Sequence, residues 1–169
     1  MPTFDLVLII LFLYFVFSGF WFGLIHTVGV ILGVVVGVLA AGNFYESVAT
    51  FLQFLFFKAG VAHVVAFILI FVVVNQLVGF IFQRIDKGFK LVSIIPFLGP
   101  INRLAGAVLG IVAGFLILGT ILTVAKAYPF SDSFSHSLET SQIAHLLIGG
   151  AAILTALLPE HLKSIIRAA

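Results

Sequence analysis

The chain has 169 residues, of which 63% are hydrophobic and only 8% are charged, and its net charge is +2. About a quarter of the residues of a soluble domain are charged, and disordered chains combine low hydrophobicity with high charge, so both classes are excluded. Without a clustered basic face the small positive charge also excludes nucleic-acid binding. The mean hydropathy of +1.34 predicts an integral membrane protein.

Charge-free intervals mark the membrane spans, because a charge at the bilayer centre costs about 2.5 to 3.5 kcal/mol. The 40 residues between Asp5 and Glu46 would form a helix about 60 Å long, twice the thickness of the hydrocarbon. The chain must therefore turn, and Ser18, Gly19 and Gly23 offer the break. Two further charge-free intervals follow later in the chain. We therefore expect an all-α membrane protein whose domain 1–125 is a small bundle of four spans, at about 4–22, 24–41, 62–82 and 104–124.

The tail, residues 126–169, is less uniformly apolar. Its segment 143–158 contains Gly149 and Gly150 and gathers its leucines on one helical face. This pattern favours an amphipathic helix on the membrane surface or beside the bundle over a fifth span. An apolar stripe over 44–55 predicts a second interfacial helix. The stretch 131–136 contains Ser, Asp and His residues like those of a hydrolytic triad, but we expect a loop there.

The basic residues predict the orientation. Four of them surround the connection between spans 3 and 4, whereas Lys58 alone lies in the connection between spans 2 and 3. Because cytoplasmic loops are enriched in Lys and Arg, the connection 83–103 is predicted to be cytoplasmic and the N-terminus to lie outside. A true fifth span would return the end of the tail to the cytoplasm.

Glycines repeat at four-residue spacing in spans 2 and 4. The two rows are Gly29, Gly33 and Gly37, and Gly106, Gly110 and Gly114. Helices in lipid gain nothing from hydrophobic burial against one another, so close backbone approach has to supply their packing. We therefore expect these glycines to be helix-packing residues, with spans 2 and 4 crossing closely. Association of copies through one glycine row is the alternative.

Four polar residues are candidates for contact with a partner or a lipid. Asn75 and Gln76 lie near the middle of span 3, where an amide either bonds another helix or lines a polar path. Asn102 and Arg103 follow the prolines of segment 93–103 and begin span 4, so Asn102 is a candidate N-cap. Arg103 is predicted to anchor the helix at the interface, or to hold a lipid phosphate or a partner carboxylate. A passive channel lined by Asn75, Gln76 and Thr120 is the alternative function.

The sequence contains no motif for catalysis or for a cofactor. The five histidines lie in five different segments, and no HExxH, nucleophile elbow, P-loop or dinucleotide fingerprint is present. With no cysteine, thiolate metal sites and disulfides are excluded. We therefore expect no enzymatic activity, no cofactor and no metal. A hydrolase using His63 or His145 is a minor alternative.

The segment Asn102-Arg103-Leu-Ala-Gly106-Ala-Val-Leu-Gly110-Ile-Val-Ala-Gly114 resembles the colicin V production protein (CvpA) family. Asp5, the turn at Gly23 and the glycine-rich second span extend the resemblance over about residues 1–124. It implies a multi-pass protein of the bacterial inner membrane that is not an enzyme and supports toxin production or export, or envelope homeostasis. Its partners would be the lipid bilayer and a second copy or another membrane protein. The first turn departs from the family, because Phe22 precedes Gly23 where members commonly have Arg.

Overall fold

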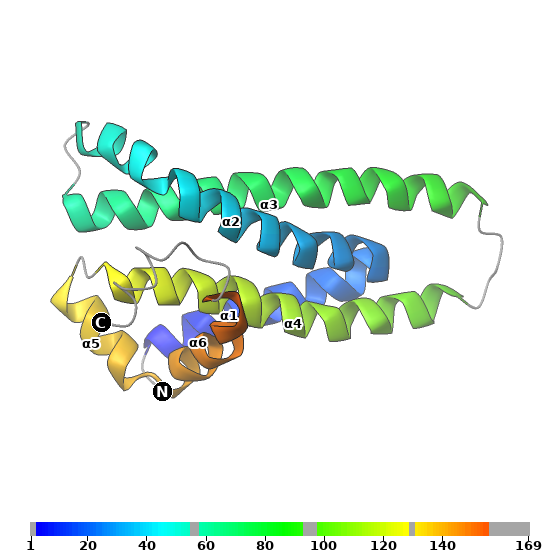
Figure 1. The fold of residues 1–169 in the computed structure, drawn as a ribbon. Helices are drawn as coiled ribbons and strands as arrows, with labels where there is room; N and C mark the ends of the chain where they lie inside the picture. Colours follow the sequence, from blue (N-terminus) through cyan, green and yellow to red (C-terminus); the bar gives the residue numbers. More distant parts are fainter. Residues whose placement is uncertain (1–2, 55–57, 93–97, 129–130, 156–169) are drawn as a thin grey trace.

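The computed structural model describes residues 3–54, 58–92, 98–128 and 131–155. These residues form six helices (Figure 1): α1 (Thr3–Phe22), α2 (Leu24–Phe54), α3 (Ala59–Val92), α4 (Leu98–Ala127), α5 (Asp132–Thr140) and α6 (Gln142–Thr155). In the described part of the chain, α1 to α4 each contain a segment long and apolar enough to cross a membrane. The predicted all-α class with four long apolar helices is confirmed.

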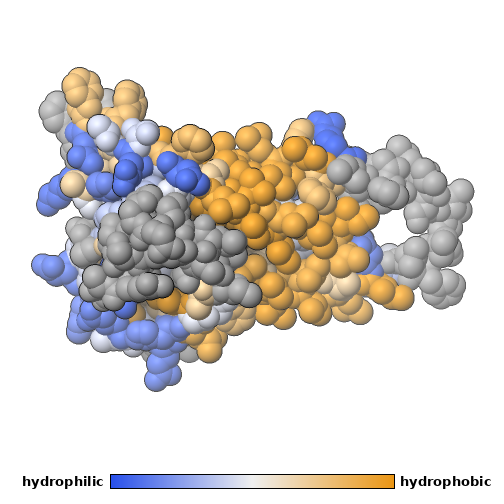
Figure 2. All heavy atoms as spheres, in the orientation of Figure 1, coloured by the Kyte–Doolittle hydropathy of each residue, from blue (hydrophilic) through white to orange (hydrophobic). Residues whose placement is uncertain are grey.

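The lengths of the helices show how they relate to a bilayer. The 20 residues of α1 correspond to about 30 Å, which matches the hydrocarbon thickness. The 31 residues of α2, 34 of α3 and 30 of α4 correspond to about 45 to 51 Å, so these helices tilt or extend past the hydrocarbon. Figure 2 shows an apolar surface over the middle of the molecule, with hydrophilic residues at the end that carries α5. The apolar surface is the region that lipid covers.

The helices pack as two pairs. α2 lies along α3, and α1 lies along α4, while α2 and α4 contact each other to join the pairs. One buried cluster, which includes Val38 and Phe67, lies among α2, α3 and α4. A second cluster, which includes Leu8, Leu122 and Leu147, lies among α1, α4 and α6. α1 and α3 therefore lie on either side of the α2–α4 contact without packing on each other.

The turn between α1 and α2 forms at Gly23, one of the predicted break points. Its φ angle of +84° lies in the left-handed region, which a residue without Cβ adopts at no steric cost. Leu24 N–H donates to Asn102 Oδ1 at 3.0 Å, and Thr27 Oγ1 donates to the Gly23 carbonyl at 2.8 Å. This turn and the start of α4 lie at the same end of the molecule (Figure 1).

Three helices extend past the predicted spans: α3 runs from Ala59 to Val92, and α2 and α4 also have other ends. α2 continues to Phe54, so the predicted interfacial helix over 44–55 is the end of α2 in its described part, and Leu55 lies outside the described residues. No Gly or Pro lies between Asn43 and Phe54 to end the helix. α4 begins at Leu98, with Pro100 in the first turn, where an N–H would have no partner within the helix. Asn102 therefore lies inside α4 and is not its N-cap.

The tail contains two helices. The predicted loop over 131–136 is wrong from Asp132 onward, because α5 occupies these residues and Ser131 is its N-cap residue. α6 has 14 residues, about 21 Å, and lies against α4 and α1, beside the bundle. Residues 156–158 of the predicted tail helix lie outside the described residues.

A buried pair of polar residues fixes the start of α6. The Ser141 hydroxyl accepts a hydrogen bond from the N–H of Ala144 at 2.9 Å, which makes Ser141 the N-cap of α6. The same hydroxyl donates to the Asp5 carboxylate, and both side chains are buried. The first turn of α1 and the start of α6 therefore share one carboxylate, which the positive ends of both helix dipoles favour.

Candidate functional site

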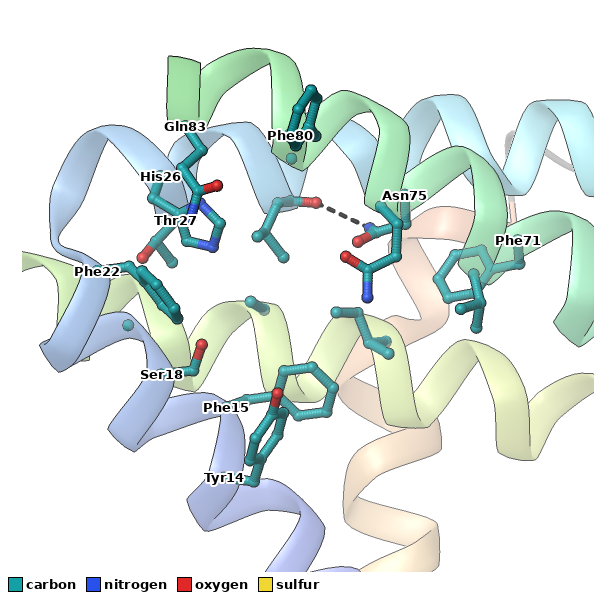
Figure 3. A pocket seen from close by; sticks show the side chains of 17 residues that line it. Tyr14, Phe15, Ser18, Phe22, His26, Thr27, Phe71, Asn75, Phe80 and Gln83 are labelled. Atoms are coloured by element: carbon teal, nitrogen blue, oxygen red, sulfur yellow. Dashed lines mark hydrogen bonds between the residues drawn. The ribbon is translucent and has the colours of Figure 1, made fainter. Parts of the chain in front are cut away.

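A groove of about 380 Å³ opens between α1 and α3, and α2 and α4 form its floor (Figure 3). It exists because α1 packs on α4 and α3 packs on α2, which leaves the space between α1 and α3 unfilled. Tyr14 and Ser18 of α1 lie across this space from Asn75 and Gln83 of α3. Its volume lies at the lower end of the range for ligand-binding pockets.

Each wall of the groove is one face of a helix. On α1 the lining residues Tyr14, Ser18 and Phe22 are four residues apart, and on α3 the lining residues Gln76, Gly79 and Gln83 are three or four apart. These spacings place the residues of each wall on a single helical face. A Cβ built on Gly79 would have only Val30 Cγ2, at 3.9 Å, within 4 Å. Gly79 itself is buried, but an added Cβ would meet no close contact on the groove side of α3.

Polar atoms reach deep into this groove. Asn75 Nδ2 donates to the carbonyl of Val30 on α2 at 3.1 Å, so Asn75 joins α3 to α2. Gln76 is exposed at the groove and lies eight residues before Arg84, about 12 Å along the helix. Arg84 ends the apolar part of α3, and its guanidinium lies over the Phe80 ring at 4.6 Å. The amide of Gln76 is therefore well below the level of the charged residues.

The groove does not extend across the whole bundle. Its lining on α3 runs from Phe71 to Gln83, about 18 Å, against about 30 Å of hydrocarbon. At the Phe71 end, the ring of this residue stacks on Phe67 with centroids 6.2 Å apart. Thr120 does not line the groove; it is buried and donates to the Leu116 carbonyl at 2.6 Å. The structure does not bring Thr120 together with Asn75 and Gln76 as the predicted channel lining requires.

The glycine row of α2 faces α3. A Cβ built on Gly33 would lie 3.1 Å from the Asn75 carbonyl oxygen, and one on Gly37 would lie 3.1 Å from that of Phe71. At Gly29 the nearest group is the side chain of Phe82. This row therefore lets the α3 backbone and two of its aromatic rings approach α2.

The glycine row of α4 faces α1. A Cβ built on Gly110 would lie 2.6 Å from the Phe15 carbonyl oxygen, and one on Gly106 would lie 2.7 Å from Gly23 Cα. Gly114 faces the ring of Phe12. α2 and α4 do contact each other, but the two glycine rows do not meet as expected. The reason is that Gly19 and Gly23 give α1 a second side-chain-free surface, so α1 and α4 approach most closely.

Asn102 and Arg103 have different environments. The Asn102 side chain accepts the hydrogen bond from Leu24 N–H, so it caps α2, a helix that begins 78 residues earlier in the chain. A Cβ on Gly23 would lie 3.0 Å from Asn102 Cγ, which shows how closely α4 approaches the turn. Arg103 is exposed. Asn102 is therefore occupied within the fold, whereas Arg103 is available to lipid or a partner.

A second polar cluster lies at the opposite end of the bundle, and the sequence analysis missed it. The hydroxyls of Tyr45 on α2 and Tyr128 after α4 lie 2.9 Å apart, and the Tyr45 hydroxyl donates to Glu46 at 3.2 Å. The His63 ring stacks on Tyr128 with centroids 4.8 Å apart, and its Nδ1 lies 2.6 Å from the Ala59 carbonyl. Burial raises the pKa of Tyr128 above its usual value of 10. The cluster joins α2, α3 and the end of α4.

Four long apolar helices that pack together define a multi-pass membrane protein. Residues 4–152 match the family model of the colicin V production protein, and the chain belongs to this family. It is similar to the uncharacterized transmembrane protein YshB of Bacillus subtilis (strain 168), with 26% identity over 173 residues, covering 92% of this chain and 95% of that protein. No solved structure matches the chain. The resemblance found in the sequence is confirmed.

Proposed function

We propose that this protein is a non-enzymatic accessory protein of the bacterial inner membrane that binds a transmembrane helix in the groove between α1 and α3. Through this binding it would support the production or export of a peptide toxin, which agrees with the name of the family, or envelope homeostasis. The observation that carries the proposal is the groove itself, which opens between two membrane-spanning helices and has polar atoms at mid-depth.

The lining of the groove has the composition of a contact between membrane helices. Ser18 is a small residue that lets a neighbouring backbone approach, and Gln76 is exposed and supplies a polar group. Small residues with a few hydrogen-bonding side chains are what membrane helices use to associate. A lipid acyl chain could fill the space, but it offers no partner for an amide about 12 Å below the charged end of α3. A helix with polar groups suits the groove better.

A passive channel is the less supported function. The polar lining on α3, from Asn75 to Gln83, covers about 12 Å, which is shorter than the hydrocarbon. Purified protein in liposomes would test this alternative, since flux of ions or small solutes down a gradient would favour it over helix binding.

We also propose that the connection 83–103 faces the cytoplasm. The basic residues near this connection support this orientation. Reporter fusions at Lys90 and Ala169 should show Lys90 inside and Ala169 outside. The opposite activities would reverse the topology.

Filling the groove tests the proposed function. Gly79→Leu places its Cβ 3.9 Å from Val30 Cγ2 and extends the side chain toward the groove that Gly79 lines, so the level of the variant in the membrane is measured alongside its function. In a strain lacking this protein, we expect the Gly79→Leu variant to reach the membrane at the normal level but to fail to restore toxin export or envelope integrity. Gly149→Leu is the matched control, because nothing lies within 4 Å of a Cβ at Gly149. Full complementation by Gly79→Leu would show that the groove is not the binding surface.

A further inference from the structure

Gln76 is a polar group that the fold of one chain leaves exposed in the groove. No other described residue forms a hydrogen bond with its amide, whereas the neighbouring Asn75 donates to Val30. A carboxamide has two N–H donors and one oxygen acceptor. In the hydrocarbon such groups must be satisfied by protein, because lipid tails offer no partner. The position of Gln76 therefore calls for a polar partner outside the single chain.

The depth of Gln76 restricts what this partner can be. The amide lies about 12 Å along α3 from Arg84, below the headgroup level, so its partner must carry a polar group at the same depth. In a symmetric dimer whose two-fold axis lies along the membrane normal, each residue lies at the depth of its own counterpart. A second copy therefore places a polar group at the required depth by symmetry alone. Two carboxamides are also self-complementary, since each can donate N–H to the oxygen of the other.

The surroundings of Gln76 fit such a contact. Val72, one turn before it on the same face of α3, and Phe80, one turn after it, are 42% and 51% exposed. Both residues line the groove, as does Gly79. Two copies of this face thus present an amide and its flanking apolar side chains to each other.

We propose that a second copy of this chain covers the groove and forms a symmetric dimer in which the two Gln76 amides bond each other across the two-fold axis. This inference rests on the proposed function, because it names the helix that the groove binds as α3 of the second copy.

Cysteine cross-linking tests the dimer directly, because the natural chain contains no cysteine. Gln76→Cys, oxidised in native membranes, should give a covalent dimer. Val72→Cys should do the same while it keeps the amide. Leu77→Cys is the matched control: Leu77 is next to Gln76 at nearly the same depth, is 59% exposed and does not line the groove. It should remain monomeric. Monomer from both groove variants, or equal dimer from all three, would overturn the proposal.

The contribution of the amide is measured separately. In pull-down of differently tagged copies from native membranes, Gln76→Leu should lower the association constant by about three- to thirty-fold, the range for interhelical hydrogen bonds in lipid. Leu77→Ala should leave it unchanged. Association of Gln76→Leu at the wild-type level would refute the amide contact.

The outcomes also separate the dimer from the proposed function. A Gln76→Cys product joined to a different protein would overturn the dimer and leave the groove as a binding surface. A dimer that forms while Gly79→Leu complements fully would overturn the proposed function and leave the dimer.

Discussion

Replacing Gly110 by alanine should separate α1 from α4. The new Cβ would lie 2.6 Å from the Phe15 carbonyl oxygen and 3.0 Å from Val16 Cα, and these backbone atoms cannot rotate away. The helices must move apart by about 0.8 Å to reach ordinary contact distances, which forfeits a quarter to a half of the dispersion energy of each atom pair. Over roughly 25 pairs at 0.1 to 0.2 kcal/mol each, the loss is about 0.6 to 2.5 kcal/mol.

The assay uses Trp21 as a reporter. It is the single tryptophan of the chain and lies on α1, so its fluorescence during denaturant titration in detergent micelles reports the release of α1. Gly149→Ala is the matched control, because nothing lies within 4 Å of its Cβ and it carries the same gain in helix propensity. Gly110→Ala should be less stable than Gly149→Ala by about 0.6 to 2.5 kcal/mol. Equal midpoints would show that the contact between the two backbones does not stabilise the bundle.

Three further predictions use the same preparation. Asn102→Ala removes the acceptor for Leu24 N–H and should lower the free energy of unfolding by about 1 kcal/mol, read from the fluorescence midpoint. Ser141→Ala removes the cap of α6 and the hydrogen bond to the Asp5 carboxylate, which should cost about 1.5 to 3 kcal/mol and speed amide hydrogen exchange in α6. The pKa of Tyr128 is raised in the folded protein, so its hydroxyl ionises first in the unfolded chain as the pH rises through about 10. The free energy of unfolding therefore falls in this pH range. Tyr128→Phe should make the unfolding midpoint fall less steeply there.

Each of these predictions has a result that contradicts it. Asn102→Asp keeps an acceptor oxygen, and Arg103→Ala alters an exposed side chain. Neither variant should lose as much stability as Asn102→Ala. Equal losses would argue that the Asn102 side chain does not stabilise the start of α2. Ser133→Ala, at an exposed position of α5, should leave exchange in α6 unchanged. If Ser141→Ala exchanges at the wild-type rate, the contact with α1 does not hold α6. An unchanged alkaline fall in Tyr128→Phe would assign that fall to another group.

The number and position of the spans could be predicted because charges are expensive in hydrocarbon. Asp5, Glu46, Arg84 and Arg103 limit where lipid can cover the chain, and Gly23 supplies the turn. The ends of the helices could not be predicted in the same way. A charge marks where a helix leaves the hydrocarbon, not where it stops, so α2 runs past Glu46 to Phe54.

The sequence could not predict which helices pack on each other. The four long helices expose large apolar side chains to lipid, so hydrophobic periodicity does not distinguish the face against protein from the face against lipid. Glycine rows identify faces that allow close approach, but not the helix that approaches. Asn75 and Gln76 were recognised as important, but their different situations, one bonded to α2 and the other at the groove, depend on tertiary packing.

The pairing of α1 with α4 has a consequence for how the protein assembles during synthesis. α2 and α3 are neighbours in the chain and can associate as soon as both are inserted, whereas α1 must wait for a helix that begins at Leu98. Until then its glycine surface faces lipid and the first N–H of α2 lacks the Asn102 side chain. Arrival of α4 thus gives α1 its main packing partner, and a chain that stops before Leu98 leaves α1 with only its smaller contact with α2.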